Sequence, residues 1–173
     1  MRAIQRIGAV KADAVYVKQN GVTDPFPAAV NCDVTLPEIS HPTYTTQSTG
    51  DMEIPDQTRV NSMTTTINAP SGGERIKLAG EGVQEYIIRF ALEVETANGL
   101  FEMRPFTAYV SGIIAQRSGQ SLTVGDVPSS DITINTFKYR LLEGDKELYN
   151  IDKLAGIVRI DGIDYRAALN SMV

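Results

Sequence analysis

The sequence predicts a mainly β fold: an antiparallel β-sandwich or barrel with one short flanking helix and a long β-hairpin. Three observations indicate this class. Apolar and polar residues alternate in many short segments, glycine-containing turns such as Asn20-Gly21 separate these segments, and helical periodicity is nearly absent. The chain has 173 residues and 42 % hydrophobic content, which suits one domain with its own core. We therefore expect a single domain over residues 1–173.

The N-terminal part is expected to begin with a β-hairpin. In "DAVYVKQNGVTD", Val15 and Val17 share one face of a strand, and Asn20-Gly21 matches a two-residue turn. The next strand, "AAVNCDVTL", has one apolar face made of alternate residues: Val30, Cys32, Val34 and Leu36. Because Cys32 is the only cysteine, it forms no internal disulfide, and we expect a small buried hydrophobe there.

Residues 42–60, "PTYTTQSTGDMEIPDQTRV", are polar on both faces and have little to bury. We expect a hairpin with two arms of about eight residues that meet near Thr49-Gly50-Asp51. A two-stranded ribbon of this kind is marginal alone in water, and its free edges invite another chain to pair. Two explanations remain, a disordered loop or a hairpin completed by neighbouring copies. The many threonines favour the second, since they are β-branched.

The rest of the chain continues the β pattern around one predicted helix. "VNSMTTTINA" reads as a strand with Met63 and Thr65 on one face. Ser71 and Glu74 have capping-box spacing, which predicts a short helix over residues 71–79. The clearest strand is "QEYIIRFALEVET", with one apolar face: Tyr86, Ile88, Phe90, Leu92 and Val94. Strands in "FTAYVSGIIAQ", "DITINTFKYRLL" and "LYNIDKLAGIVRI", a hairpin turn at Asp161-Gly162 and a helical turn in "DYRAALNSM" complete the prediction.

Composition and motifs argue against catalysis and against tight nucleic-acid binding. The net charge is −5 with a sequence pI of about 4.9, whereas affinity for phosphates comes largely from Lys and Arg. The single histidine, His41, precedes a proline and is expected to be an exposed turn residue. The carboxylate pairs, Asp51/Glu53, Asp145/Glu147 and Asp161/Asp164, all fall at predicted turns, where Asp is favoured for local reasons. We expect no enzyme activity, no cofactor, no metal site and no membrane span.

Two sequence blocks resemble the major tail tube proteins of contractile-tailed, P2-like bacteriophages. In "VNCDVTLPEISHPTYTTQSTGDMEIPDQTRVNSMTTTI", a strand ending in Val-Thr-Leu-Pro is followed by a polar hairpin with a proline in its return arm and then a Thr-rich strand. In "FKYRLLEGDKELYNIDKLAGIVRIDGIDY", glycine turns alternate with "KEL", "ID" and a closing "DY". With the strand-rich middle, the resemblance covers roughly residues 12–166.

The resemblance implies that six copies form a ring, that rings stack into the inner tube of a virion tail, and that the hairpin at 42–60 joins a barrel shared between subunits. If each copy gives four strands, the 24-stranded barrel has a backbone diameter of roughly 48 Å, wide enough for duplex DNA. By alternation, we expect these residues to face the lumen: Thr43, Thr45, Gln47, Asp51, Glu53 and Gln57. The hairpin's other face, Met52, Ile54 and Val60, is expected to pack against the subunit.

The resemblance also implies partners: the tail sheath protein, the tape measure, baseplate and tail terminator proteins, and passing double-stranded DNA that is not specifically bound. Assembly would take place in the cytoplasm of the bacterial host, with no membrane involved. One alternative is the tube of an R-type bacteriocin or another contractile injection particle that has no genome. Another is a monomeric β-sandwich binding module, which is disfavoured because Tyr86, Phe90 and Phe106 fall on apolar strand faces.

Overall fold

The computed structural model describes residues 7–19, 21–47, 50–70, 82–120 and 122–173, which form strands and one short helix. The first seven strands are β1 (Ile7–Gln19), β2 (Val22–Thr23), β3 (Ala29–Val30), β4 (Asp33–Thr35), β5 (Thr43–Thr46), β6 (Met52–Pro55) and β7 (Met63–Pro70). The others are β8 (Gln84–Glu95), β9 (Phe101–Arg117), β10 (Ser129–Glu143), β11 (Lys146–Asp152), β12 (Ile157–Ile160) and β13 (Ile163–Asp164), and the helix is α2 (Ala167–Asn170). Within these residues, no helix has the length and apolar character needed to cross a bilayer.

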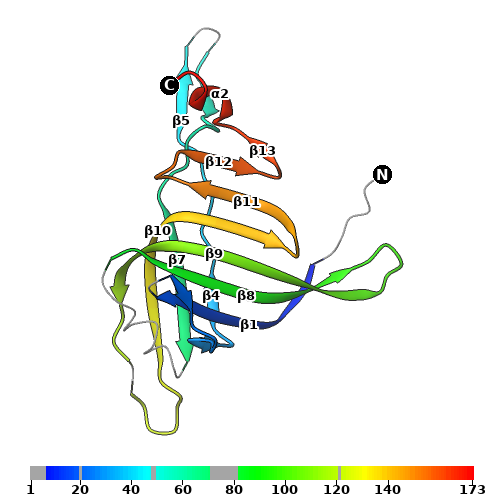
Figure 1. The fold of residues 1–173 in the computed structure, drawn as a ribbon, viewed down its shortest axis with the longest axis vertical. Coiled ribbons are helices and arrows are strands. Elements are labelled where there is room, and N and C mark those ends of the chain that lie inside the picture. The colour runs from blue at the N-terminus through cyan, green and yellow to red at the C-terminus, as the bar shows by residue number, and fades with distance from the viewer. Residues whose placement is uncertain (1–6, 20, 48–49, 71–81, 121) are drawn as a thin grey trace.

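Eleven of the strands form one antiparallel sheet, whose central path runs β13-β12-β11-β10-β9-β8-β1-β2 (Figure 1). The sheet branches at β10, because two strands share one of its edges. Residues Ser129–Thr136 of β10 pair with β7, whereas Lys138–Glu143 pair with β11. In Figure 1, β7 and β4 run steeply across the long strands β1, β8 and β9. The predicted antiparallel, mainly β fold is therefore confirmed.

The core lies between the long strands and β7. Alternate residues of each element are buried, as in Met63, Thr65 and Ile67 of β7 and in Tyr86 and Ile88 of β8. Thr65 lies in this layer without leaving its hydroxyl unsatisfied, because its Oγ1 is 2.7 Å from that of the buried Thr136. The apolar faces that alternation predicts for β7 and β8 are thus the faces that pack.

Two predicted turns are confirmed by strand register. Gln19 pairs with Val22, so two residues connect β1 to β2. Ile160 pairs with Ile163, and the connecting Asp161-Gly162 has φ values of 48° and 82°. Positive φ at both central residues defines the turn type that matches strand twist. The helical turn expected near the C-terminus is α2, whereas the predicted helix at 71–79 lies outside the described residues.

The predicted single strand "AAVNCDVTL" is wrong in one respect, because the structure divides it into β3 and β4. Asn31 has φ of 51°, which reverses the alternation and leaves Val30 51 % exposed while Cys32 stays buried. Asparagine tolerates this left-handed conformation better than most residues. As a result β3 pairs with β1 whereas β4 pairs with β7, so the chain crosses from one edge of the sheet to the other.

The sheet does not close into a barrel within the described residues. The strands β4, β7, β10, β9, β8 and β1 are paired in that order. The edges of this series, β1 and β4, face each other without a ladder between them. In the described part of the chain, hydrogen bonds join the two edges at Asp13, whose carbonyl oxygen accepts from the Asn31 N–H at 3.1 Å and whose carboxylate accepts from the Cys32 N–H at 2.7 Å. The subunit is therefore an open, sandwich-like sheet. We call the unpaired region between β1 and β4 the seam.

Candidate assembly surface

The polar segment at 42–60 forms the expected hairpin. Its strands β5 and β6 make a separate two-stranded sheet, in which Thr43 pairs with Pro55 and Thr46 pairs with Met52. Figure 1 shows this hairpin projecting from one end of the molecule, near α2. Among the described strands, none pairs with its outer edges. Among the described residues, the hairpin is therefore held by its own ladder and by its base.

The expected arms of about eight residues are too long, since each strand has four residues. Prolines explain the difference, because proline cannot donate to a ladder. Pro55 is the last residue of β6, and beyond it the Asp56 N–H donates to the Pro42 carbonyl oxygen at 2.7 Å. The strand alternation consequently ends at Pro55, and Gln57 lies in a turn rather than in a strand.

The base of the hairpin is closed by hydrogen bonds between its two arms. His41 Nδ1 donates to the Arg59 carbonyl oxygen at 2.7 Å, and the Asn61 N–H donates to the Ser40 carbonyl oxygen at 2.9 Å. The Asp56 carboxylate accepts from the Thr58 hydroxyl at 2.6 Å and from its N–H at 3.0 Å, and these bonds lower the pKa of Asp56. These bonds join the two arms at the base, and Lys153 Nζ donates to the Asn61 carbonyl oxygen at 3.1 Å, which connects the base to the rest of the subunit.

The residues expected to face the lumen are all exposed in the single chain: Thr43, Thr45, Gln47, Asp51, Glu53 and Gln57. Register places Thr43, Thr45 and Glu53 on one face, because Thr45 pairs with Glu53. That this face lines a channel stays a prediction, since exposure in one chain does not identify what lies opposite.

The other face of the hairpin packs unevenly. Val60 is half-buried and contacts the core, and Ile54 is half-buried. Met52 is 51 % exposed, and Tyr44, which pairs with Ile54 on the same face, is 54 % exposed. That this face packs against the subunit body stays a prediction.

Sequence reasoning missed two other projections that carry exposed apolar side chains. The β8–β9 hairpin extends beyond the body in Figure 1, and near its tip Leu100, Phe101 and Met103 are 59–69 % exposed. The β9–β10 connection projects at the end opposite β5–β6, with Leu122, Val124 and Val127 exposed. The signal was present, because "LFEM" follows the Asn98-Gly99 turn where polar residues are usual.

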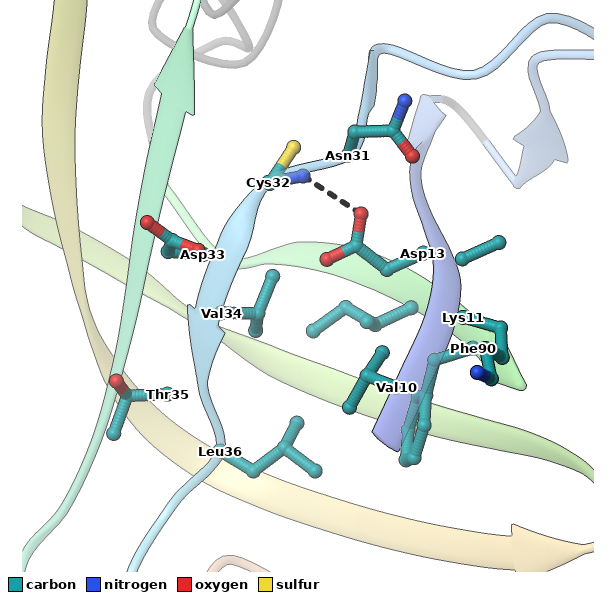
Figure 2. Close-up of a pocket in the computed structure, with 12 residues that line it drawn as sticks. Val10, Lys11, Asp13, Asn31, Cys32, Asp33, Val34, Thr35, Leu36 and Phe90 are labelled. Atoms are coloured by element: carbon teal, nitrogen blue, oxygen red, sulfur yellow. Dashed lines mark hydrogen bonds between the residues drawn. The ribbon is translucent and has the colours of Figure 1, made fainter. Parts of the chain in front are cut away.

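A pocket of about 540 Å³ lies in the seam between β1 and β4, and Figure 2 shows the side chains that line it. There the Cys32 N–H donates to Asp13 Oδ1 at 2.7 Å. Burial raises the pKa of the Cys32 thiol to about 11, with Asp13 and Asp33 adding to the effect. The thiol therefore stays protonated at neutral pH, and this cleft has no activated nucleophile.

Two carboxylates from the sequence pairs, Glu147 and Asp164, take part in an ion pair and a turn. Glu147 accepts from Arg140 Nε at 2.7 Å, and Asp164 accepts from the Arg166 N–H at 2.9 Å. No three His, Cys, Asp or Glu side chains in the described part of the chain form a group that could hold a metal ion. Both carboxylates therefore have local structural partners.

Comparisons with known proteins agree with the architecture. The family model described as phage tail tube protein FII matches residues 20–172. A search of curated proteins found no significant match. Among solved structures, one similar chain comes from the sheath/tube terminator structure of the extracellular contractile injection system PVC in its extended state. It has 18 % identity and a TM-score of 0.52, over 81 % of this chain and 99 % of that one. This likeness shows a shared fold.

Two further structures are similar over comparable lengths. A chain of the PVC sheath–tube complex in its extended state has 16 % identity and a TM-score of 0.48, covering 76 % of this chain and 88 % of that one. A chain of the anti-feeding prophage (AFP) baseplate has 14 % identity and a TM-score of 0.42, covering 79 % and 95 %.

Proposed function

Because the chain belongs to the family of phage tail tube protein FII and is a structural protein of the tail tube, we propose that six copies close into a ring and that stacked rings form the tube. The observation that carries this proposal is the β5–β6 hairpin. It is a two-stranded sheet with no lateral partner among the described strands, projecting from the body, with its base closed by hydrogen bonds between its own arms. Neighbouring copies of the chain supply the missing partners.

The exposed polar face of the hairpin borders the channel of this tube. Thr43, Thr45 and Glu53 share that face, and the segment carries the acids Asp51, Glu53 and Asp56 against the single base Arg59. A surface with a net negative charge repels phosphate, so double-stranded DNA passes without binding. The exposed residues Gln47, Asp51 and Gln57 also border the channel.

The proposed tube has further partners and no catalytic role. In an assembled tail, a sheath protein surrounds the tube, and tape measure, baseplate and tail terminator proteins contact its lumen and ends. Assembly takes place in the cytoplasm of the bacterial host, and the finished tube is part of the virion tail. A genome-free particle, such as a bacteriocin, would use the same tube, and the DNA content of purified particles separates the two.

Electron microscopy of the purified protein tests the proposal. We expect wild-type protein to form hollow tubes with six copies in each ring. Replacing residues 43–55 by Asn-Gly keeps the Pro42–Asp56 contact, which can close over a two-residue turn. We expect this variant to unfold at about the same temperature as wild type but to form no tubes. Tubes of equal length and number from the variant would overturn the role of the hairpin.

A further inference from the structure

The two ends of the molecule carry exposed apolar side chains. One end bears the β9–β10 connection, and the opposite end bears α2 beside the β5–β6 hairpin (Figure 1). At the first end we define the tip patch, whose members are each 67 % or more exposed: Leu122, Val124 and Val127. At the second end we define the α2 patch, whose members are each 44 % or more exposed: Leu154, Leu169 and Met172.

The tip patch lies on a tight turn whose geometry does not require apolar residues. The Asp126 N–H donates to the Thr123 carbonyl oxygen at 3.1 Å, which closes the turn, and Gly125 supplies a positive φ of 98°. Val124 lies between Thr123 and Gly125, at a position where polar residues are usual. Apolar side chains grouped on such a projection are typical of a contact with another chain.

The α2 patch is attached on one side and uncovered on the other. None of the residues Ala167–Asn170 is buried, and no side chain caps the helix at its N-terminus. A helix of four residues has little stability of its own. It is attached through Asn170, whose Nδ2 donates to the Gly156 carbonyl oxygen at 3.2 Å. This hydrogen bond brings α2 next to the β11–β12 turn that carries Leu154.

The direction of the β5–β6 hairpin relates these two ends to the axis of the proposed tube. In Figure 1 the longest axis of the molecule is vertical, and β5 runs close to it. Strands of a β-barrel tilt from the barrel axis by roughly 35–45°. With the hairpin in the shared barrel, the long axis of the subunit lies at least as close to the tube axis as to the plane of a ring. The two ends therefore face successive rings.

A contact between these ends joins two different surfaces, so it is heterologous and can repeat along the tube without closing. The patches suit each other, because each consists of three apolar side chains. Their nearest charged residues in the sequence have opposite signs, since Asp126 lies in the tip turn and Lys153 precedes Leu154. The β8–β9 arm also has exposed apolar residues, but it projects from the side of the molecule in Figure 1 rather than from an end.

We propose that the tip patch of each subunit docks on the α2 patch of a second copy in the next ring, so that this apolar contact connects the rings. This inference rests on the proposed tube and names the surfaces through which its rings stack. Docking removes both patches from water, and a ring repeats the gain in every copy. One pair of subunits buries only a few side chains, so stable stacking requires the many simultaneous contacts that a ring provides.

Removing the tip patch separates stacking from ring formation. In Leu122→Ser/Val124→Ser, the turn keeps Gly125 and Asp126, so we expect the subunit to fold and to form rings. We expect fewer stacked tubes than for wild type, by about tenfold or more, because the loss of apolar area recurs in every copy of each ring. Electron microscopy and sedimentation measure tubes and rings, and circular dichroism establishes that the variant is folded.

The matched control removes two comparably exposed apolar side chains outside both patches. Val22 lies in β2, and Phe26 lies between β2 and β3. We expect Val22→Ser/Phe26→Ser to form tubes as wild type does. Tubes of wild-type length and number from Leu122→Ser/Val124→Ser would overturn the inference, and so would an equal loss of tubes from both double variants.

Cross-linking identifies the partner surface. The single native cysteine, Cys32, is buried, so Val124→Cys/Met172→Cys offers one accessible thiol in each patch. Cysteine keeps a small apolar side chain at both positions. With a short bis-maleimide added to assembled tubes, we expect a ladder of linked chains that continues beyond the copies of one ring, because each link joins successive rings. Each single-cysteine variant should stay unlinked on a denaturing gel.

Three results of this experiment would overturn the inference while leaving the tube in place. A ladder that ends at the number of copies in one ring would place the contact within a ring. Linked dimers from a single-cysteine variant would show that like ends meet. Tubes of Val124→Cys/Met172→Cys that give no ladder would show that the two patches do not meet. Failure of wild-type protein to form tubes would instead overturn the proposed function.

Discussion

The N–H of Cys32 donates a 2.7 Å hydrogen bond to the carboxylate of Asp13, joining two edges of the sheet that share no ladder. Asp13 lies in β1, and Cys32 directly precedes β4. The Asn31 N–H donates to the carbonyl oxygen of the same aspartate. Asp13 thus binds the two consecutive peptide N–H groups on either side of the Asn31 α-carbon, where the chain crosses from β3 to β4.

Asp13→Ala is expected to lower the free energy of unfolding by about 1–3 kcal/mol, because it leaves the N–H of the buried Cys32 without an acceptor. Asp13→Asn keeps a side-chain oxygen at the same position and should lose less than about 1 kcal/mol. Urea denaturation of the two variants measures the difference. Equal losses would show that the hydrogen bond to Cys32 is not what stabilises the crossing.

The Cys32 thiol is expected to react slowly in the folded protein. Burial raises its pKa to about 11 from a usual 9.0, so at pH 9 about 1 % is thiolate, compared with about half in the unfolded chain. Alkylation by iodoacetamide should therefore accelerate between pH 9 and pH 11 in native protein, and by pH 9 in urea. A native rate that already levels off at pH 9 would contradict this.

Gly112→Ala is expected to destabilise the sheet by about 1–3 kcal/mol or more, through overpacking. A Cβ at this position would lie against the Asn135 carbonyl oxygen and 2.8 Å from Ile134 Cγ2, where β9 and β10 shift register. Gly119→Ala is the matched control, since a Cβ there meets nothing within 4 Å. Thermal denaturation should show a lower midpoint only for Gly112→Ala, and similar midpoints for both would count against the packing described here.

Glu53→Lys places one positive charge per copy on the polar face of the hairpin, opposite Thr45. We expect tubes to assemble normally and genome delivery to slow, most strongly at low salt. Glu38→Lys, at an exposed position outside the hairpin, is the control. Delivery by Glu53→Lys particles at the control rate in low salt would refute the lumen assignment. Loss of tubes would place Glu53 in a contact between subunits.

Alternation and turn residues could predict much of this fold. The apolar faces of β7 and β8 and the turns before β2 and β13 follow from residue types alone. The division at Asn31 could not be predicted, because Val30, Cys32 and Val34 still alternate in the sequence while one left-handed residue changes the pairing partner. Local patterning does not encode which strand a segment pairs with.

The candidate site was only partly predictable for a related reason. The exposure and shared face of Thr45 and Glu53 follow from two-residue periodicity, but the short arms follow from how Pro42 and Pro55 meet across the hairpin. The ion pairs that connect β10, β11 and β12 were not predictable. Arg140, Glu147 and Arg159 come together only through the register of three strands, and sequence spacing does not fix that register.

Hydrogen exchange of the β5–β6 hairpin tests most directly whether its strands are completed by other copies. In the free subunit, the outer-edge amides within residues 43–46 and 52–54 lack partners among the described strands, so we expect fast exchange. In assembled tubes the same amides should exchange at least tenfold more slowly, while amides in the middle of β9, paired on both edges in one chain, should change little. Equal exchange of the hairpin in verified free subunits and in tubes would contradict the account.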